Sequence, residues 1–191
     1  MEKKHQNSKA ELRKHSGKRN EMSKYVFKPY HPVFPQLFED EKKRLSKFLS
    51  GNVQIEHVGS TAVPGLGGKG IIDIYIVGPR DDLDRVSAEV LKSGYEYRPR
   101  VSVDQHVFHR IDLPDPIEGT RRYHVHISYP EAEDFKQAIK FRDYLRSHPQ
   151  DVQKYAEAKQ KAANEADQDK DKYMAIKTPA ISEILEKVLK Q

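Results

Sequence analysis

Residues 53–77 read VQIEHVGSTAVPGLGGKGIIDIYIV, a glycine-rich segment between two apolar, β-branched runs. The runs at 53–58 and 71–77 have the composition of β-strands. The segment between them is crowded with residues that interrupt regular structure: Gly59, Pro64, Gly65, Gly67, Gly68 and Gly70. A loop of this composition either connects two strands or holds a phosphate group with its backbone amides.

The second strand carries an aspartate in an otherwise apolar context. Side chains two residues apart point to the same face of a strand, so Asp73 shares a face with Tyr75. The opposite face consists of Ile72, Ile74 and Ile76. An ionised carboxylate at such a position needs a hydrogen-bond donor, a cation or water. Asp73 therefore either bonds amides of the glycine-rich loop at a wet strand end or belongs to a functional site, and the pattern favours neither.

The loop does not match the common nucleotide-binding motifs. In a P-loop the lysine is followed by Ser or Thr, whereas Lys69 is followed by Gly70, and the first glycine of the motif would fall on Val63. In the dinucleotide-binding fingerprint the glycines lead into a helix, and here a second strand follows. The sequence therefore argues against both a Walker ATPase and a Rossmann dinucleotide site.

A later strand, RRYHVHISY (121–129), places His124 and His126 on one face. Two imidazoles at this spacing can bind one metal ion or contact a phosphate. They can also be satisfied by neighbouring groups in a sheet, which is the commoner situation for this pattern taken alone. Arg110, at the end of HVFHRID, is a further cation that could reach the same area, although an isolated basic strand residue is more often solvated.

The composition indicates a globular protein in a reducing compartment. The 191 residues include 36% apolar and 33% charged side chains and no cysteine, so neither disulfides nor thiolate chemistry is available. We expect a cytoplasmic location. No apolar run approaches the roughly 20 residues of a membrane helix, and no signal-peptide segment follows Met1, so no membrane partner is expected.

The basic character is concentrated at the N-terminus. Residues 1–22 contain seven Lys or Arg and three Glu, which accounts for +4 of the net charge of +5. Because this stretch lacks aromatic and β-branched side chains, residues 1–23 are expected to be a disordered basic tail and residues 24–191 one domain. The tail could contact nucleic acid, but a solvated tail is the preferred interpretation, and the body lacks the charge of a nucleic-acid-binding surface.

Periodicity predicts the remaining elements. Helical spacing is present at 35–50 and 82–93, an extended segment is expected at 25–30, and two strands around a turn at 95–112. The segment LPDPIEGT (113–120) is predicted to be a loop. The expected fold class is therefore α/β (α+β), with a mixed β-sheet flanked by helices.

The last sixty residues are predicted to be helical. Helices are expected at 131–146, 149–166 and 178–190. The last of them would begin with Thr178 as N-cap and Pro179 at its first position. The run DQDKDK (167–172) lacks the glycine and glutamate of a calcium-binding loop and is expected to connect two helices. This helical C-terminal third would cover one side of the sheet or wall a cleft.

Four stretches of the chain are distinctive in combination. They are FKPYHPVFPQLFEDEKKRL (27–45), IEHVGSTAVPGLGGKGIIDI (55–74), YHVHIS (123–128) and FRDYLRSHPQDVQKYAEAKQ (141–160). Together they resemble the GrpB family, also known as UPF0157, from about residue 25 to the C-terminus. GrpB proteins are related to the nucleotidyltransferase superfamily, so the resemblance implies a nucleotidyltransferase-like sheet flanked by helices.

The resemblance also implies an activity, the transfer of a nucleotidyl group from a nucleoside triphosphate to a small acceptor. Gly59 and Ser60 would be the Gly-Ser turn that binds the outer phosphates, and Asp73 would be the first metal-binding carboxylate. The expected cofactor is a divalent metal ion, Mg²⁺ or Mn²⁺. Lys69 would add positive charge at the phosphates or remain an exposed loop lysine, and Arg142 of FRDYLR would bind a phosphate in the cleft or lie at the surface.

The sequence departs from the superfamily pattern at the second carboxylate, where Tyr75 stands instead. The position of the third carboxylate falls within HVH, so the metal ligands would be Asp73, His124 and His126, a set that suits a softer ion such as Zn²⁺. Alternatively no metal binds and the histidines hold an anion. Three functions remain open: a nucleotidyltransferase with Asp73 and Ser60 as catalytic residues, an inactive nucleotide- or anion-binding module, and a metal-dependent hydrolase built on the Asp and His side chains.

Overall fold

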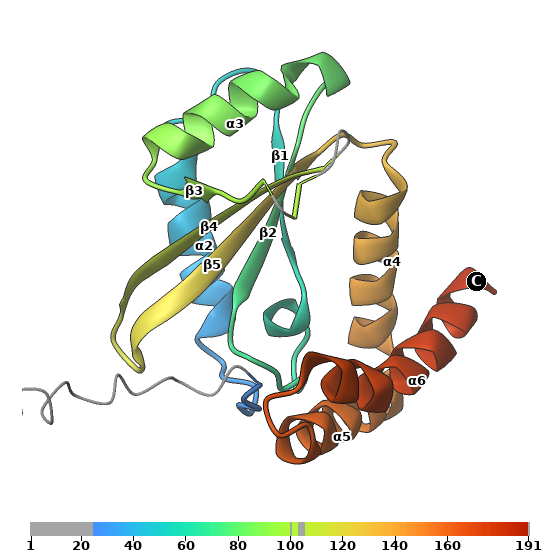
Figure 1. Ribbon diagram of the computed structural model, residues 1–191. Helices are drawn as coiled ribbons and strands as arrows, with labels where there is room; N and C mark the ends of the chain where they lie inside the picture. Colours follow the sequence, from blue (N-terminus) through green and yellow to red (C-terminus); the bar gives the residue numbers. More distant parts are fainter. Residues whose placement is uncertain (1–24, 100, 103–105, 191) are drawn as a thin grey trace, which may run out of the picture.

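The computed structural model describes residues 25–99, 101–102 and 106–190. Its centre is a five-stranded sheet in the order β1-β2-β5-β4-β3, in which β2 and β5 are parallel and the other neighbours are antiparallel. The strands are β1 (Gln54–Val58), β2 (Ile72–Val77), β3 (Glu96–Tyr97), β4 (Val107–Asp115) and β5 (Gly119–Ser128). The α-helices are α2 (Phe34–Leu45), α3 (Leu83–Lys92), α4 (Glu133–Ser147), α5 (Pro149–Glu165) and α6 (Lys170–Leu189). The predicted mixed sheet flanked by helices is confirmed (Figure 1).

One face of the sheet forms the main core. Ile72, Ile74 and Ile76 of β2 are 0% exposed, and they pack in one apolar cluster with side chains of β5, α2 and α3. Strand alternation therefore directs the intervening side chains, Asp73 and Tyr75, to the opposite face. The isoleucine face of β2 thus determines which side of the sheet carries Asp73 and Tyr75.

The helices α4, α5 and α6 form the helical C-terminal third that the sequence predicts. They share a second core with the glycine-rich loop, made of Val63, Leu66, Tyr144, Leu145, Val152, Tyr155, Ile184 and Val188. Figure 1 shows α4 beside the sheet and α5 and α6 below it. Because two loop residues belong to this core, the loop is packed against the helices. No helix among the described residues combines the length and the apolar character needed to span a membrane.

The last helix begins earlier than predicted. α6 starts at Lys170, and Pro179, expected at its first turn, lies inside the helix. The carboxylate of Asp169 caps the helix by accepting hydrogen bonds from two backbone amides of the first turn, at 2.8 and 2.9 Å. This cap favours the earlier start, and the buried side chains Tyr173, Ile184 and Val188 stabilise the helix against the backbone hydrogen bond that its internal proline cannot make. The start predicted at Thr178 is therefore wrong.

The segment 113–120 is not the predicted loop. β4 continues to Asp115 and β5 begins at Gly119, so the turn comprises 116–118. Pro114 is tolerated because, within the described chain, β3 pairs with β4 only near residues 109–110, which leaves the outer edge of β4 free at the proline.

One N-terminal element also differs from expectation. Helix α2 ends at Leu45 and not at residue 50. The segment 25–30, expected to be a short strand or an extended lead-in, makes one isolated bridge, between Lys28 and Gly68. That bridge attaches the lead-in segment to the glycine-rich loop. The predicted basic tail, residues 1–23, lies outside the described residues.

Candidate functional site

The register between β2 and β5 brings the predicted polar groups together. The ladder pairs Asp73 with His124 and Tyr75 with His126, so these four side chains project from one face of the sheet. Asp73 Oδ1 lies 3.0 Å from His124 Nδ1 and 3.9 Å from His126 Nε2. The three predicted metal ligands are therefore adjacent, and their ligating atoms lie within 4.8 Å of one another.

The two histidines stabilise the ionised form of Asp73. Burial by itself raises the pKa of this carboxyl, but the hydrogen bonds and charges of His124 and His126 outweigh burial and hold the pKa well below its usual range. His126 is oriented through its other nitrogen, because Nδ1 lies 2.8 Å from Nε2 of His106. A histidine held at one ring nitrogen presents the other in a fixed direction, as metal-binding histidines do.

Gly59 allows the Gly-Ser turn to approach Asp73 closely. Its φ of +72° is one that other L-residues avoid, and a Cβ at this position would collide with Oδ2 of Asp73. The turn is anchored by Thr61, whose hydroxyl donates a 2.9 Å hydrogen bond to the carbonyl of Ile71 and lies 3.0 Å from Nε2 of the buried His57. The motif HVGST therefore fixes the turn against the start of β2.

A Gly59→Ala variant is expected to lose more stability than an alanine variant at another glycine with a similar positive φ. Gly119 has φ of +74°, and a Cβ there would meet nothing within 4 Å. Gly119→Ala should therefore lower the free energy of unfolding by about 1–2 kcal/mol through backbone strain alone. Gly59→Ala carries strain of its own, because φ of +72° with ψ of −169° is a conformation adopted essentially by glycine alone, and it also displaces the Asp73 carboxylate. Urea unfolding compares the two variants, and equal losses would contradict the close packing of turn and carboxylate.

Ser60 lies beside a lysine that the sequence pattern does not single out. A Cβ added to Gly68 would be 2.6 Å from Ser60 Oγ and 3.3 Å from Lys159 Nζ, so the hydroxyl and the ammonium both lie against this glycine. Lys159 belongs to α5, and its ammonium donates a hydrogen bond to the carbonyl of Gly67 at 3.2 Å. The packing of α5 on the glycine-rich loop thus adds a cation next to the predicted phosphate-binding turn.

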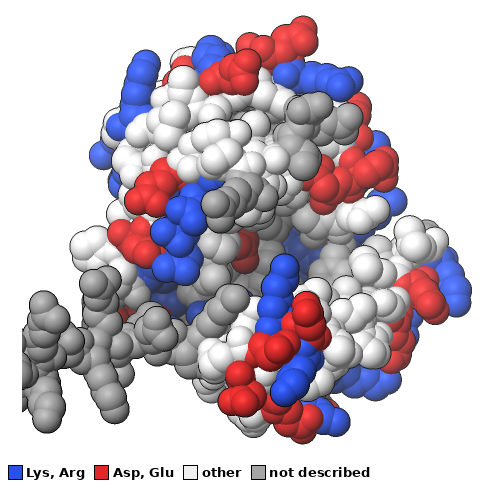
Figure 2. Space-filling model, viewed as in Figure 1, with Lys and Arg blue, Asp and Glu red and all other residues white. Residues whose placement is uncertain are grey.

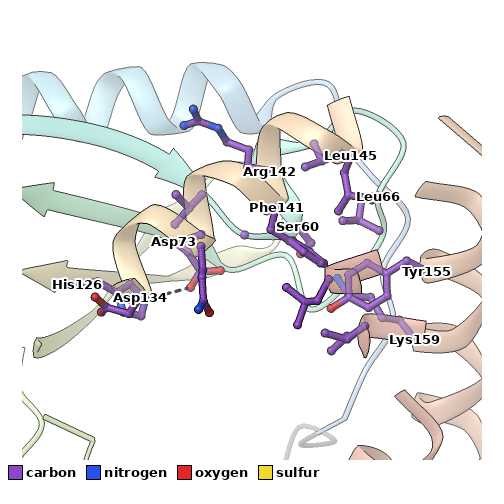
Figure 3. A pocket seen from close by; sticks show the side chains of 17 residues that line it. Ser60, Leu66, Asp73, His126, Asp134, Phe141, Arg142, Leu145, Tyr155 and Lys159 are labelled. Atoms are coloured by element: carbon purple, nitrogen blue, oxygen red, sulfur yellow. Dashed lines mark ion pairs between the residues drawn. The ribbon is translucent and has the colours of Figure 1, made fainter. Parts of the chain in front are cut away.

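A cavity of about 500 Å³ is lined by Gly59, Ser60, Asp73, His126 and Lys159, whereas His124 lies outside its lining. In Figure 3, Asp73, His126 and Asp134 lie toward one end of the cavity and Tyr155 and Lys159 toward the other. The apolar part of its wall consists of Val58, Val63, Leu66, Ala138, Phe141, Leu145, Ile181 and Leu185. Figure 2 shows the surface hollowed between the part of the molecule that carries the sheet and the part that carries α5 and α6. A cavity of this size is typical of sites for small molecules and cofactors.

The second carboxylate at the cavity comes from a helix and not from β2. Tyr75 occupies the strand position at which the sequence resemblance implies a second acid, and its hydroxyl donates a 3.1 Å hydrogen bond to Oδ2 of Asp134 in the first turn of α4. Nδ1 of His106 lies 3.4 Å from the same oxygen. Asp134 and Asp73 line the same cavity. Nothing in the local sequence distinguishes Asp134 from a solvated acid at the start of a helix.

The predicted cationic residues are distributed differently. Arg142 lines the cavity, but its guanidinium lies 2.6 Å from Oε2 of Glu56 and donates to the backbone carbonyl of His57 at 2.9 Å. Arg110 lies 3.5 Å from a carboxylate oxygen on β3, outside the cavity lining. Lys69 is also outside the lining, with its ammonium 4.7 Å from the ring centroid of Tyr25. Of the residues predicted from the sequence, Gly59, Ser60, Asp73, His126 and Arg142 reach the cavity.

The chemistry of the donor set decides which metal ions fit. One carboxylate and two imidazoles suit Zn²⁺ or Mn²⁺ better than Mg²⁺, which prefers oxygen ligands. Ligands bound at about 2.0–2.2 Å from Zn²⁺ stand roughly 3–4 Å from one another. The separations of 3.0 and 3.9 Å between Asp73 and the two histidines match that range. Two of the three separations in the set meet this range, so Asp73, His124 and His126 could hold one such ion.

Comparison with known proteins places the chain in a family. The profile of the family described as GrpB protein matches residues 24–187. A UPF0157 protein of Pseudomonas aeruginosa is 36% identical over 163 residues, which cover 84% of this chain and 66% of that protein, so the chain spans just under two thirds of this relative. A protein of Mycolicibacterium paratuberculosis named dephospho-CoA kinase is 30% identical over 174 residues, 79% of this chain and 42% of that protein.

A solved structure agrees with the family assignment. The crystal structure of the conserved protein GrpB from Enterococcus faecalis matches with a TM-score of 0.72 and 30% identity, covering 86% of this chain and 98% of that chain. The family profile spans the sheet, the glycine-rich loop and nearly all of the C-terminal helices. The chain belongs to the GrpB family.

Proposed function

We propose that this GrpB protein transfers a nucleotidyl group from a nucleoside triphosphate to the hydroxyl or amine of a small acceptor, with a divalent metal ion as cofactor. The observation that carries the proposal is the convergence of the Gly59–Ser60 turn, Asp73 and two imidazoles on one face of the sheet beside a cavity of about 500 Å³. The resemblance to nucleotidyltransferases supplies the reaction class.

The residues at the cavity have separate roles in this proposal. The amides of the turn and the hydroxyl of Ser60 bind the outer phosphates. Asp73, His124 and His126 would hold the metal ion, which when bound neutralises negative charge on the phosphates. The acceptor oxygen forms a bond to the α-phosphorus, the bond from this phosphorus to the β-phosphate oxygen breaks, and pyrophosphate leaves. Asp134 accepts the proton of the attacking group, because it is the carboxylate on the cavity that the metal set does not use.

The apolar wall of the cavity supports a ligand that is not phosphate alone. Leu66 and Leu145 are almost completely buried beneath the cavity, and Phe141 and Ile181 lie partly exposed at its surface. Such a wall accommodates a nucleoside or an acceptor with an apolar portion. The Mycolicibacterium relative carries the name dephospho-CoA kinase, which denotes phosphoryl transfer to an adenine-containing molecule and makes adenine nucleotides the first to test.

One observation favours a second candidate, an inactive nucleotide-binding module. Tyr75 replaces the second strand carboxylate, and its hydrogen bond to Asp134 occupies one of the carboxylate oxygens that chemistry would need. On this hypothesis the fold retains the phosphate-binding turn and has lost catalysis. A third candidate, a metal-dependent hydrolase, uses the same Asp and His ligands with water as the acceptor.

A ligand screen separates these functions. Thermal shifts with each nucleoside triphosphate and Mg²⁺, Mn²⁺ or Zn²⁺ measure binding, and mass spectrometry of the incubated mixtures identifies products. Nucleotidyl transfer should release pyrophosphate in the presence of a pool of small hydroxyl and amine acceptors, and Ser60→Ala should weaken nucleotide binding about tenfold or more through the lost hydrogen bond to charged phosphate. Ser46→Ala is the matched control, because Ser46 is exposed and outside the cavity lining.

Each outcome of the screen points to one function. Stabilisation by nucleotide without any product favours the inactive module. Nucleoside monophosphate or inorganic phosphate formed without an acceptor adduct favours the hydrolase. Absence of any nucleotide-induced shift in the wild type would reject nucleotide binding itself.

A further inference from the structure

Lys159 is a buried cation in the cavity wall. The residue is 8% exposed, and its ammonium lies 4.5 Å from the ring centroid of Tyr155. The same ammonium donates a 3.2 Å hydrogen bond to the carbonyl of Gly67. Within the described part of the chain, no carboxylate lies within 4.0 Å of the Lys159 ammonium. A buried charge without a counter-charge is unfavourable unless a ligand provides one.

Two further lysines converge on the same region from other elements. Lys177 of α6 and Lys69 of the glycine-rich loop each place the ammonium 5.5 Å from the ring centroid of Tyr173. Burial is the largest of the effects that lower the pKa of Lys159 to about 7, and the positive charges of Lys177 and Lys69 lower it further. The negative charge of Asp73 acts in the opposite direction. Burial also lowers the pKa of Lys177. The lysines are therefore close enough to repel one another, and an anion between them would relieve that repulsion.

We propose that Lys159 binds the outer phosphates of the ligand next to Ser60, while Lys69 and Lys177, which lie outside the cavity lining, add positive charge at longer range. The identity of the anion as a nucleotide phosphate rests on the proposed function, whereas the anion site itself does not. Ser60 Oγ and Lys159 Nζ both lie against Gly68, so one phosphate group can contact both. The phosphate supplies the negative charge that the buried ammonium lacks.

Binding at this site should take up a proton. In the free protein Lys159 has a pKa of about 7, and a bound anion raises it toward the ordinary lysine value of about 10.4. Below pH about 7 the lysine is already charged, so the dissociation constant is flat there. Above that pH, binding must recruit a proton, and the dissociation constant rises by up to about tenfold per pH unit until the pKa of the complex is reached.

Most other titrating groups around Lys159 keep one charge state above pH 7, so they add little to the proton uptake. Burial raises the pKa of Tyr155 and of Tyr173, so both phenols remain neutral. The hydrogen bonds from its histidines keep Asp73 ionised. Lys177 is the facing group that can share the effect, because its pKa is also lowered by burial. A substitution of Lys159 is therefore required to assign the proton.

The experiment is calorimetric titration of the full chain with methyl phosphate, without divalent ions, between pH 7.5 and 9.5. The second ionisation of a phosphate monoester lies near pH 6, so the probe is essentially fully ionised in this range. Titrations in two buffers with different ionisation enthalpies measure the protons taken up. The wild type should take up close to one proton at the upper end and weaken by up to about tenfold per pH unit.

Three variants assign the effect to Lys159. Lys159→Arg should bind with little dependence on pH, because a guanidinium stays charged. Lys159→Met should lose at least about tenfold in affinity at pH 7.5, through loss of a charge-assisted hydrogen bond. Lys154→Met is the matched control on the same helix: its side chain is 62% exposed, and it should behave as the wild type. Thermal unfolding verifies that each variant is folded.

Wild-type affinity in Lys159→Met, or the wild-type pH dependence in Lys159→Arg, would overturn the proposal. The same titration of an Asp73→Asn variant separates this proposal from the proposed function. Proton-linked anion binding that persists in that variant supports the lysine site even if no nucleotidyl transfer is ever detected. Transfer activity combined with anion binding that is independent of Lys159 rejects the lysine site and leaves the proposed function intact.

Discussion

An Asp73→Asn variant is expected to lose at least about 100-fold in affinity for Zn²⁺ or Mn²⁺ and to lose metal-dependent nucleotide turnover. Even residues that merely orient metal ligands change affinity by about 10–100-fold, and Asp73 contributes the one carboxylate of the set with His124 and His126. Asparagine preserves the shape of the side chain but removes the negative charge that attracts the cation. The wild-type and variant dissociation constants are measured by calorimetry, and turnover by pyrophosphate release.

The matched control for Asp73→Asn is Asp112→Asn. Asp112 lies on β4, forms an ion pair with Arg122 and is 39% exposed, so its loss should leave metal affinity and turnover unchanged. The fold should survive in both variants, because an asparagine at position 73 can still accept a hydrogen bond from His124. Wild-type metal affinity in Asp73→Asn would show that this carboxylate does not ligate metal and would remove the central group of the proposed site.

The alternation of IIDIYIV and YHVHIS was sufficient to predict which side chains share a face. Asp73 and Tyr75 separate from the isoleucines, and His124 and His126 separate from Val125, because a strand has a period of two. The same alternation does not predict that these two strands are neighbours in the sheet. They lie about fifty residues apart and pair in parallel, an arrangement that depends on the whole sheet order.

The functional groups supplied by helices were not predictable in the same way. Lys159 lies in AEAKQKAANE, where its local context resembles that of any solvated helix lysine, including Lys161. It is buried because α5 packs on the glycine-rich loop. Asp134 reaches the cavity because α4 lies beside the sheet. Both placements depend on tertiary packing, which overrides the local pattern that a single helix presents.

The start of α6 is determined by one of two local N-terminal signals in the sequence. Thr178 before Pro179 has the pattern of a helix N-terminus, yet Asp169 provides a cap with two hydrogen bonds nine residues earlier. A helix that has already begun can incorporate a proline at the loss of one backbone hydrogen bond. The position of Lys177, which is part of the proposed anion site, depends on this earlier start.

The second large effect is expected for Arg121→Met, which should lower the free energy of unfolding by about 3–5 kcal/mol. Arg121 and Asp115 form an ion pair at 2.6 Å in which both side chains are 1% exposed. Arg121 also donates to the carbonyl of Gly70 at 2.7 Å, which ties the β4–β5 hairpin to the end of the glycine-rich loop. Methionine leaves the Asp115 carboxylate buried without its cation, and urea unfolding at neutral pH measures the loss.

The neighbouring residue provides the control for this prediction. Arg122 also pairs with an aspartate across the same two strands, at 2.8 Å from Asp112, but these side chains are 43% and 39% exposed. Arg122→Met should therefore change the free energy of unfolding by about 0–1 kcal/mol. Equal losses of unfolding free energy in the two variants would show that burial does not determine how much the Arg121–Asp115 pair contributes to stability.

The difference between wild type and Arg121→Met should shrink in acid. Burial raises the pKa of Asp115, but in the wild type the hydrogen bond of Arg121 and two backbone amides outweigh burial and lower it. The stability from this lowered pKa is complete above the ordinary aspartate value of about 3.9 and is lost as the pH falls through the folded-state pKa. Without Arg121, the pKa of Asp115 is higher than in the wild type, because less opposes the effect of burial. The carboxyl of the variant therefore takes up a proton at higher pH, and the protein no longer buries an unpaired negative charge. A deficit that stays constant from pH 7 down to about pH 3, below the ordinary aspartate pKa of about 3.9, would mean that the loss comes from packing and not from the buried carboxylate.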